Sequence, residues 1–146
     1  MALLDRAAPR DLFDVAHFAD GHLTVEGERP RRLFVALSAV LPRSLADYGR
    51  KRLDRVTDAM VAENLHPLLQ STDRPGAAEL RERVWQEVEP LLDLTDAERE
   101  YVNTVQHGDL RPELLFPDDS ELVERLRHHP ALLWKVENAR RWRERS

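Results

Sequence analysis

Apolar residues recur at helical spacing along most of this chain, and that periodicity limits the fold more than any other feature. The clearest case is a run of four residues, each three or four positions after the one before: Leu80, Val84, Val88 and Leu91. Such spacing places side chains on one face of a helix. No stretch alternates apolar and polar residues for long enough to make a convincing strand. The sequence therefore predicts an all-α fold, a compact bundle of six to eight helices.

Composition indicates a soluble globular protein, with 42% hydrophobic and 34% charged residues. A chain of 146 residues is long enough to bury its own core, and we expect one helical domain over residues 1–146. No apolar run approaches the roughly 20 residues that span a bilayer. The chain also has no cysteine, which fits a reducing compartment. We therefore expect a cytoplasmic protein with no membrane partner.

Capping signals predict where the helices begin and end. Thr95 and Glu98 form a capping box that opens a helix running to about Gln106, and Gly108 is its stop. The other predicted helices cover residues 2–7, 33–41, 50–69, 80–92 and 122–127, with one more from Pro9 to a stop at Gly21 and a last one from Pro130 onward. The helix over 2–7 has no start signal, and a break is expected at Pro67. Asp118 and Glu121 open the helix over 122–127.

The helix that Pro9 opens carries a dense charged motif, Arg10-Asp11-Leu12-Phe13-Asp14. Residues three apart on a helix lie one turn apart, so Asp11 and Asp14 could approach one ligand. Carboxylates so placed can hold Mg²⁺ or accept a proton during phosphoryl transfer, and Arg10 could hold a phosphate. Spacing alone favours a plainer interpretation, in which Asp11 suits the helix dipole and Arg10 pairs with Asp14.

The net charge of −5 conceals a basic block. Residues 29–55 carry a net charge of +6, residues 56–134 carry −10, and residues 135–146 carry +3. The cations of the basic block are Arg29, Arg31, Arg32, Arg43, Arg50, Lys51, Arg52 and Arg55. Such a block can bind a phosphate-bearing partner, and the candidate nucleic-acid contacts are Arg50, Lys51, Arg52 and Arg55. The favoured interpretation is that the block pairs with the acidic middle of the same chain.

Two further patterns carry weaker signals. The last helix sets Trp134 and Trp142 among arginines, a composition that can stack on bases and grip phosphates. The favoured interpretation is one buried tryptophan, with Leu133, Trp134 and Val136 on the apolar side, followed by a basic tail at the helix C-terminus. The six histidines lack the i, i+4 spacing of a helical metal pair. No metal site is therefore expected in this chain alone.

Residues 2–17 resemble the last active-site motif of the AbiEii/AbiGii nucleotidyltransferase toxins, the toxin partners of type IV toxin–antitoxin systems. In that family a helix of the form Lys-x-x-Ala-Leu, then Arg, leads into Arg-Asp-x-x-Asp followed by apolar positions. Residues 109–116 (Asp-Leu-Arg-Pro-Glu-Leu-Leu-Phe) and 129–138 (His-Pro-Ala-Leu-Leu-Trp-Lys-Val-Glu-Asn) resemble the family's closing segments. The likeness therefore spans nearly the whole chain.

The resemblance implies a DNA-polymerase-β-like nucleotidyltransferase followed by a helical C-terminal domain, with residues 1–20 as the remnant of the last active-site motif. For an intact enzyme it implies Mg²⁺ and an NTP, a tRNA acceptor in some relatives, and an antitoxin protein as partner. Carried over by position, Arg10 contacts phosphate. One of Asp11 and Asp14 is then the catalytic or metal-facing carboxylate.

Three parts of the family pattern are absent: the Gly-Gly-Ser/Thr motif that cradles the triphosphate, the Asp-x-Asp pair that binds metal, and the lysine before Ala2. All would lie upstream of Met1 with the core sheet, so we expect a truncated product or a separately encoded N-terminal catalytic half. Charge neutralisation and positioning supply most of the catalysis in phosphoryl transfer. We therefore expect the chain alone to be inactive, with no cofactor of its own.

Two alternatives remain open at the level of sequence. One is a stand-alone helical module that binds RNA or an antitoxin through the basic block at residues 29–55. The other is a decayed gene product with no function of its own.

Overall fold

The computed structural model describes residues 2–20, 27–70 and 72–145. Within these ranges the chain forms eight α-helices and four short 3-10 helices, and no strand. The all-α prediction is therefore confirmed for the described ranges, with a helix count in the expected range. The predicted stop at Gly21 and the histidine at position 22 lie outside them. Among the described helices, none has the length and apolar character that a membrane crossing requires.

The chain folds into two compact units, each assembled from two separate stretches of sequence. Unit 1 comprises Met1–Thr24 and Tyr48–Leu92, and unit 2 comprises Val25–Asp47 and Asp93–Ser146. The chain therefore passes from one unit to the other three times. A single domain over residues 1–146 stays a prediction, because units recognised by their internal contacts need not fold independently.

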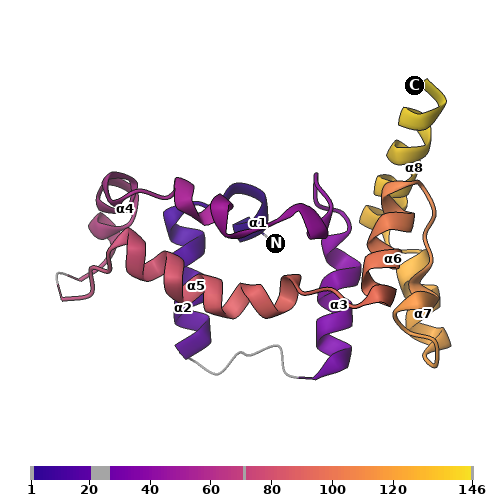
Figure 1. Cartoon of the computed structure of the whole chain (residues 1–146), viewed down its shortest axis with the longest axis horizontal. Helices are drawn as coiled ribbons and strands as arrows, with labels where there is room; N and C mark the ends of the chain where they lie inside the picture. The colour runs from indigo at the N-terminus through magenta and orange to yellow at the C-terminus, as the bar shows by residue number, and fades with distance from the viewer. Residues whose placement is uncertain (1, 21–26, 71, 146) are drawn as a thin grey trace. The chain divides into compact units, whose positions relative to one another are not determined.

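Unit 1 is organised by the packing of α2 (Pro9–Asp20) against α5 (Ala77–Leu92), which cross each other in Figure 1. The fully buried side chains of these two helices include Leu12 and Ala16 of α2 and Leu80 and Val84 of the predicted apolar run. Val88 of that run is 8% exposed, and Leu91 is half-buried. Four shorter elements complete the unit: α1 (Ala2–Arg6), η2 (Arg50–Arg55), α4 (Asp58–Asn64) and η3 (His66–Leu68). Of these, α1 contacts α2, and α4 contacts both α2 and α5.

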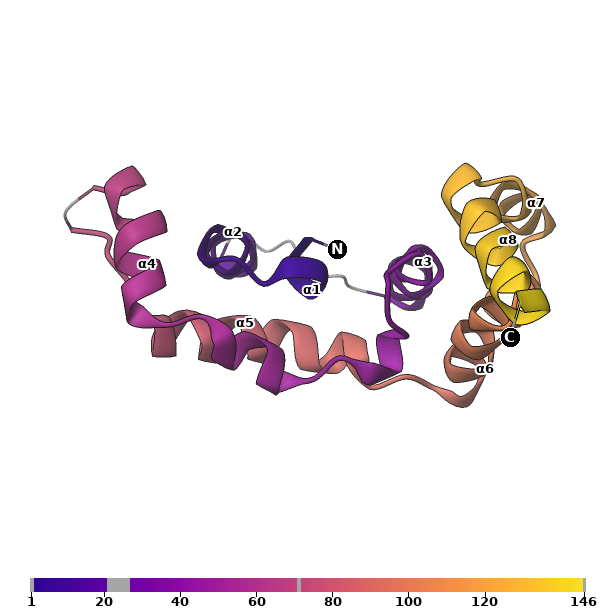
Figure 2. The same cartoon turned by 90° about the horizontal axis from the view of Figure 1, so that it is seen from above.

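Unit 2 is built around α6 (Asp96–Gln106), which contacts both α3 (Glu28–Ser38) and α8 (Pro130–Arg145). The buried Tyr101 of α6 donates a hydrogen bond from its hydroxyl to the carbonyl oxygen of Ala36 in α3, at 3.3 Å. Beside α8 runs α7 (Ser120–Arg127), as Figures 1 and 2 show. The short helices η1 (Leu45–Asp47) and η4 (Pro112–Leu114) also contact α6.

Both ends of α6 follow the predicted signals. The Thr95 hydroxyl accepts a hydrogen bond from the Glu98 N–H, and the Glu98 carboxylate accepts one from the Thr95 N–H, so the capping box is complete. At the other end Gly108 has φ +83°, and a Cβ added there would lie 2.6 Å from Cγ of Arg140. Glycine is required here both by the backbone conformation and by the close approach of α8.

The helix predicted over residues 50–69 is divided before the expected break. It forms η2, α4 and η3, because Thr57 adopts an extended backbone and its hydroxyl accepts a hydrogen bond from the Met60 N–H. Thr57 thereby caps a new helix. The predicted break at Pro67 is present, since α4 ends at Asn64 and Pro67 lies within η3.

Other boundaries also differ from the predictions, and the helix expected over 80–92 begins at Ala77. The helix expected from Leu33 to Leu41 begins at Glu28 and ends at Ser38, because Pro30 fits the first turn, where its fixed φ and missing N–H are tolerated. The helix expected behind Asp118 is capped by Asp119 instead. The Asp119 carboxylate accepts a hydrogen bond from the Leu122 N–H at 3.0 Å.

Candidate functional site

Asp11, the first aspartate of the charged motif, is held from two sides at the start of α2 and is only 8% exposed. Arg6 donates from Nε to Oδ2 and from Nη2 to Oδ1, both at 2.9 Å. The backbone N–H of Ala8 donates to Oδ2 at 3.2 Å. Hydrogen bonding from Arg6 lowers the pKa of Asp11, against the opposing effect of burial. This geometry agrees with the interpretation of Asp11 as a helix-start residue.

The turn between α1 and α2 depends on Ala7, which has φ +51°. This is the left-handed region, which costs an alanine roughly 1 kcal/mol. The Ala7 N–H donates to the carbonyl oxygen of Leu3 at 3.0 Å, and its methyl group is buried. The Arg6–Asp11 pair spans this turn and joins the two helices across it.

Arg10 and Asp14 are both exposed on α2. Arg10 Nε donates to the carbonyl oxygen of Asn64, the last residue of α4, at 3.3 Å, a favourable position for a cation at a helix C-terminus. The expected Arg10–Asp14 ion pair is wrong, since none of the ion pairs between described residues joins them. Asp14 is therefore the carboxylate of the motif that faces solvent.

The described residues do not by themselves fit a Mg²⁺ site. Both carboxylate oxygens of Asp11 accept hydrogen bonds from Arg6, so a cation would have to displace the guanidinium group. In the described ranges no group of three or more acidic or histidine side chains could hold a metal ion.

The basic block at residues 29–55 is divided between the two units, and several of its arginines pair within the chain. Arg29 pairs with Asp119, Arg31 with Glu98, and Arg50 with Glu82. All three carboxylates belong to the acidic segment 56–134. The predicted pairing of the block with the acidic middle of the chain is confirmed for these arginines.

The four candidate nucleic-acid contacts lie on η2 and differ in their surroundings. Arg52 donates to the carbonyl oxygens of Leu4 and Asp5 and lies over the ring of Tyr48, so it attaches η2 to α1. Arg50 forms the ion pair with Glu82 at 2.6 Å. Lys51 and Arg55 are exposed, and they take part in none of the ion pairs found in the described ranges.

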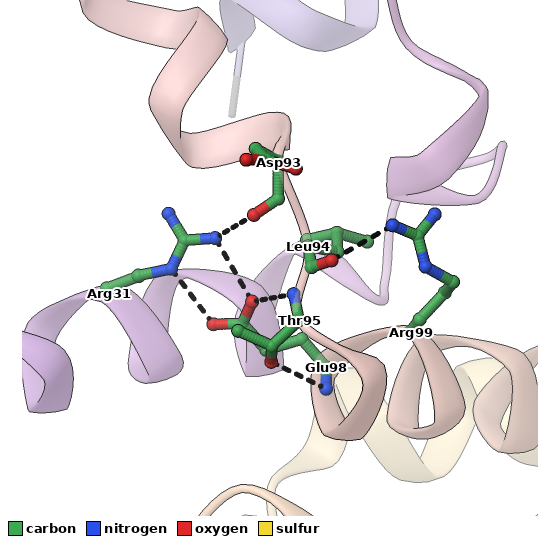
Figure 3. Close-up of polar contacts among 6 residues, drawn as sticks. All are labelled: Arg31, Asp93, Leu94, Thr95, Glu98 and Arg99. Carbon is green, nitrogen blue, oxygen red and sulfur yellow. Dashed lines mark hydrogen bonds and ion pairs between the residues drawn. The ribbon is translucent and has the colours of Figure 1, made fainter.

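A polar cluster that the sequence did not predict as a unit joins α3 to the start of α6 (Figure 3). Glu98 is 2% exposed, and Arg31 donates from Nε and Nη2 to its two oxygens, both at 3.0 Å. Arg31 also donates to the carbonyl oxygen of Asp93 at 2.5 Å. Burial raises the pKa of Glu98, but hydrogen bonds from Arg31 and Thr95 outweigh it and hold the pKa below its usual value.

Only half of this cluster has a local sequence signal. The capping box identifies Glu98 as a residue that accepts the Thr95 N–H. The second partner, Arg31, lies 67 positions away and was visible only as one cation of the basic block. The cluster joins two helices, and its bidentate geometry is the strong form of an arginine–carboxylate contact.

An open groove of about 880 Å³ lies in unit 2 between residues 42–47 and α6. Its polar lining includes Arg43, Asp47, Arg99, Glu100, Asn103 and Gln106. The guanidinium group of Arg99 donates to the carbonyl oxygen of Leu94 at 2.9 Å (Figure 3). The lining mixes both signs of charge, so the groove selects neither an anion nor a cation by electrostatics alone.

The expectation of one buried tryptophan on the last helix is wrong. Trp134 is 67% exposed and Trp142 is 70% exposed, and Leu133 is also exposed, whereas Leu132 and Val136 are buried. Two positions along a helix turn a side chain by about 200°. The packing of Leu132 and Val136 therefore turns Trp134 outward.

The chain matches no family model, no curated protein and no solved structure. The resemblance to the nucleotidyltransferase toxins rests on the residues of the chain itself.

Proposed function

We propose that this chain is the C-terminal helical part of an AbiEii-like nucleotidyltransferase toxin. In this proposal it is a cytoplasmic protein that contributes one wall of an active site and transfers no nucleotide by itself. The supporting observation is the division of roles within the motif. Asp11 is locked to Arg6, whereas Asp14 faces solvent on the same helix. A solvent-facing carboxylate one turn from Arg10 suits a site that other residues complete.

The proposal leaves the binding of Mg²⁺ and NTP mainly to residues outside this chain. A separately encoded or preceding catalytic segment is the partner that it requires. By the family resemblance, tRNA is the proposed acceptor and an antitoxin protein is the proposed inhibitor.

A labelled-nucleotide assay tests the proposal. The purified chain, incubated with radiolabelled NTP, Mg²⁺ and tRNA, is expected to transfer no label. A nucleotidyltransferase core of the family, fused before Ala2, is expected to restore transfer. In that fusion Asp14→Asn should lower the rate by roughly 10²- to 10⁴-fold, the usual contribution of a proton-transferring group.

Two controls separate chemistry from folding. Asp54→Asn removes another exposed carboxylate of unit 1 and should leave the rate unchanged. Asp11→Asn should lower the melting temperature as well as the rate, because it removes the partner of Arg6. Label transfer by the chain alone, or a fusion that tolerates Asp14→Asn, would contradict the proposal.

A second candidate is a helical module that binds RNA or an antitoxin through the basic block. The observation that favours it is the exposure of Lys51 and Arg55 on η2. Against it stands the engagement of Arg50 and Arg52 within the chain. This candidate requires tRNA affinity that falls steeply with salt and is lost in the Lys51→Ser/Arg55→Ser variant.

A further inference from the structure

The outward face of α8 carries a pattern that neither proposed function uses. At 3.6 residues per turn, five side chains project within an arc of about 100°, roughly opposite the buried Leu132 and Val136. They are Trp134, Asn138, Arg141, Trp142 and Arg145. Two of the three tryptophans of the chain thus lie on one exposed helix face beside two arginines.

This face belongs to a helix that is anchored along its length. Lys135 Nζ donates to the carbonyl oxygen of Leu41 at 2.7 Å. Farther along, Arg140 donates to the carbonyl oxygen of Gly108 at 2.6 Å, and Arg143 to that of His107 at 3.0 Å. These contacts hold the helix as far as its last turns, which extend past the ends of α6 and α7 in Figure 1. The tryptophans are therefore presented on a fixed support.

The chemistry of the face favours a nucleic-acid strand over an apolar protein groove. An apolar groove would match a continuous stripe of aliphatic side chains, but here indole rings are interleaved with guanidinium groups. Indole faces stack on bases, and guanidinium groups match phosphate oxygens. The net charge of +3 over residues 135–146 has the sign that a polyanion requires.

We propose that the outward face of α8 binds a single-stranded nucleic-acid segment. Trp134 and Trp142 stack on bases, and Arg141 and Arg145 contact phosphates. The two tryptophans are separated by about 12 Å of helix rise, so they engage bases that are not adjacent. Unpaired bases are required, because the bases of a duplex are already stacked on each other.

The contacts that the two arginines of this face make within the chain do not prevent binding. Arg145 donates from Nε to the carbonyl oxygen of Arg141, at 3.1 Å. Arg141 Nε lies 3.0 Å from Oε1 of Glu137, and both side chains are exposed. Exposed pairs of this kind contribute little, so the guanidinium group can turn toward a phosphate. The proposal goes beyond the nucleotidyltransferase assignment and does not rest on it.

Fluorescence anisotropy of the whole chain with labelled oligonucleotides tests the proposal. The probes are single-stranded RNA, single-stranded DNA and duplex DNA, each of about 16 nucleotides. At 50 mM salt we expect a single-stranded probe to bind more tightly than the duplex. Whether RNA, DNA or both bind identifies the kind of strand, and each of these results supports the proposal.

Two variants remove the two kinds of contact separately. Trp134→Ala/Trp142→Ala should weaken binding by at least roughly tenfold, given the usual loss for each stacked base. Arg141→Ser/Arg145→Ser should weaken binding and reduce the slope of log affinity against log salt by about 1.4. Circular dichroism should show unchanged helix content in both, because all four side chains are exposed.

The matched control is Arg74→Ser/Arg125→Ser, which removes the same charge from exposed positions outside α8 and outside the basic block and should leave affinity unchanged. Four results would overturn the proposal: single-strand affinity weaker than about 100 µM, affinity that survives the tryptophan variant, equal loss in the Arg74→Ser/Arg125→Ser control, or self-association that the tryptophan variant abolishes. The last result would make this face a contact between two copies of the chain.

Discussion

The buried carboxylate of Glu98 is stabilised by Arg31, which is distant from it in the sequence. The carboxylate is almost completely buried, and its charge is balanced by the two hydrogen bonds from Arg31. Removing one member of a buried pair leaves the other charge uncompensated, at a cost of roughly 3–5 kcal/mol. We expect Arg31→Ala to lower the free energy of unfolding by an amount near the lower end of that range, because Arg31 is partly exposed.

Urea denaturation followed by circular dichroism measures this effect. The control is Arg125→Ala, which removes an i, i+4 pair with Glu121 in which both side chains are exposed. Such pairs contribute little, so the midpoint of that variant should barely move. If the two variants lost the same free energy of unfolding, the burial of Glu98 would not be the cause of the destabilisation.

The same carboxylates make stability depend on acid. The pKa values of Asp11 and Glu98 both lie below their ordinary values in the folded chain. The unfolded chain therefore takes up protons first as the pH falls. The stabilisation is complete above the ordinary values of about 4 and is lost as the pH drops through the folded values.

We expect the free energy of unfolding to fall between about pH 5 and pH 3. Glu98→Gln should start from a lower stability at pH 7 and lose less of it over this window, because position 98 no longer titrates. Urea titrations at several pH values compare the two slopes. If the free energy of unfolding fell equally with pH in Glu98→Gln and in the original chain, Glu98 would not contribute to the pH dependence.

At the scale of elements, the turn that ends α6 leaves no room for a side chain at Gly108, because α8 packs against it. An added Cβ at Gly108 meets Arg140 Cγ at 2.6 Å and the Arg140 backbone nitrogen at 3.2 Å, and φ is +83°. We expect Gly108→Ala to destabilise the chain by more than about 1 kcal/mol, since strain and collision act together. Thermal unfolding measures the loss.

Gly49 provides the matched substitution. It has an extended backbone, and a Cβ added there has nothing within 4 Å. Gly49→Ala should therefore be neutral or stabilising by up to about 1 kcal/mol, because it restricts the unfolded chain. A Gly108→Ala variant as stable as Gly49→Ala would mean that α8 can shift without cost.

Local signals predicted the elements whose causes are local. The capping box at Thr95, the stop at Gly108 and the start at Pro130 are all present. The division of residues 50–69 was missed although the N-cap at Thr57 is local, and a distant contact also supports it. Asp58, in the first turn of α4, accepts a hydrogen bond from the Ala77 N–H at the start of α5, at 2.8 Å.

In the candidate site, too, the features with local causes were predicted and a feature set by tertiary packing was not. Sequence predicted the helix-start position of Asp11 and the internal pairing of the basic block, which follow from spacing and charge. It placed Trp134 on the wrong side of the last helix. Apolar residues occur on more than one face of that segment, and only tertiary packing selects Leu132 and Val136.

At the scale of the whole molecule, neither unit is a continuous piece of chain. Residues 93–146 contain α6 but not α3, which supplies both Arg31 and the carbonyl group that accepts the Tyr101 hydroxyl. We expect a fragment of residues 93–146 to have low helix content by circular dichroism, because Glu98 and Tyr101 lack their partners. Adding a peptide of residues 25–47 should raise that content.

The same peptide with Arg31→Ala is the control and should raise the helix content less. A fragment that is fully helical without any peptide would contradict this account, because α3 would then be unnecessary to the folding of the rest of unit 2.

The interleaved path of the chain also fixes an order of events on the ribosome. Arg31 precedes Glu98 by 67 residues, which at about 5–20 residues per second means a delay of roughly 3–13 seconds. During that interval the newly made α3 segment lacks the helix that will cover it. The last stretch of unit 1 ends at Leu92, so unit 1 can close first. Unit 2 closes later, although its first segment is translated before the second half of unit 1.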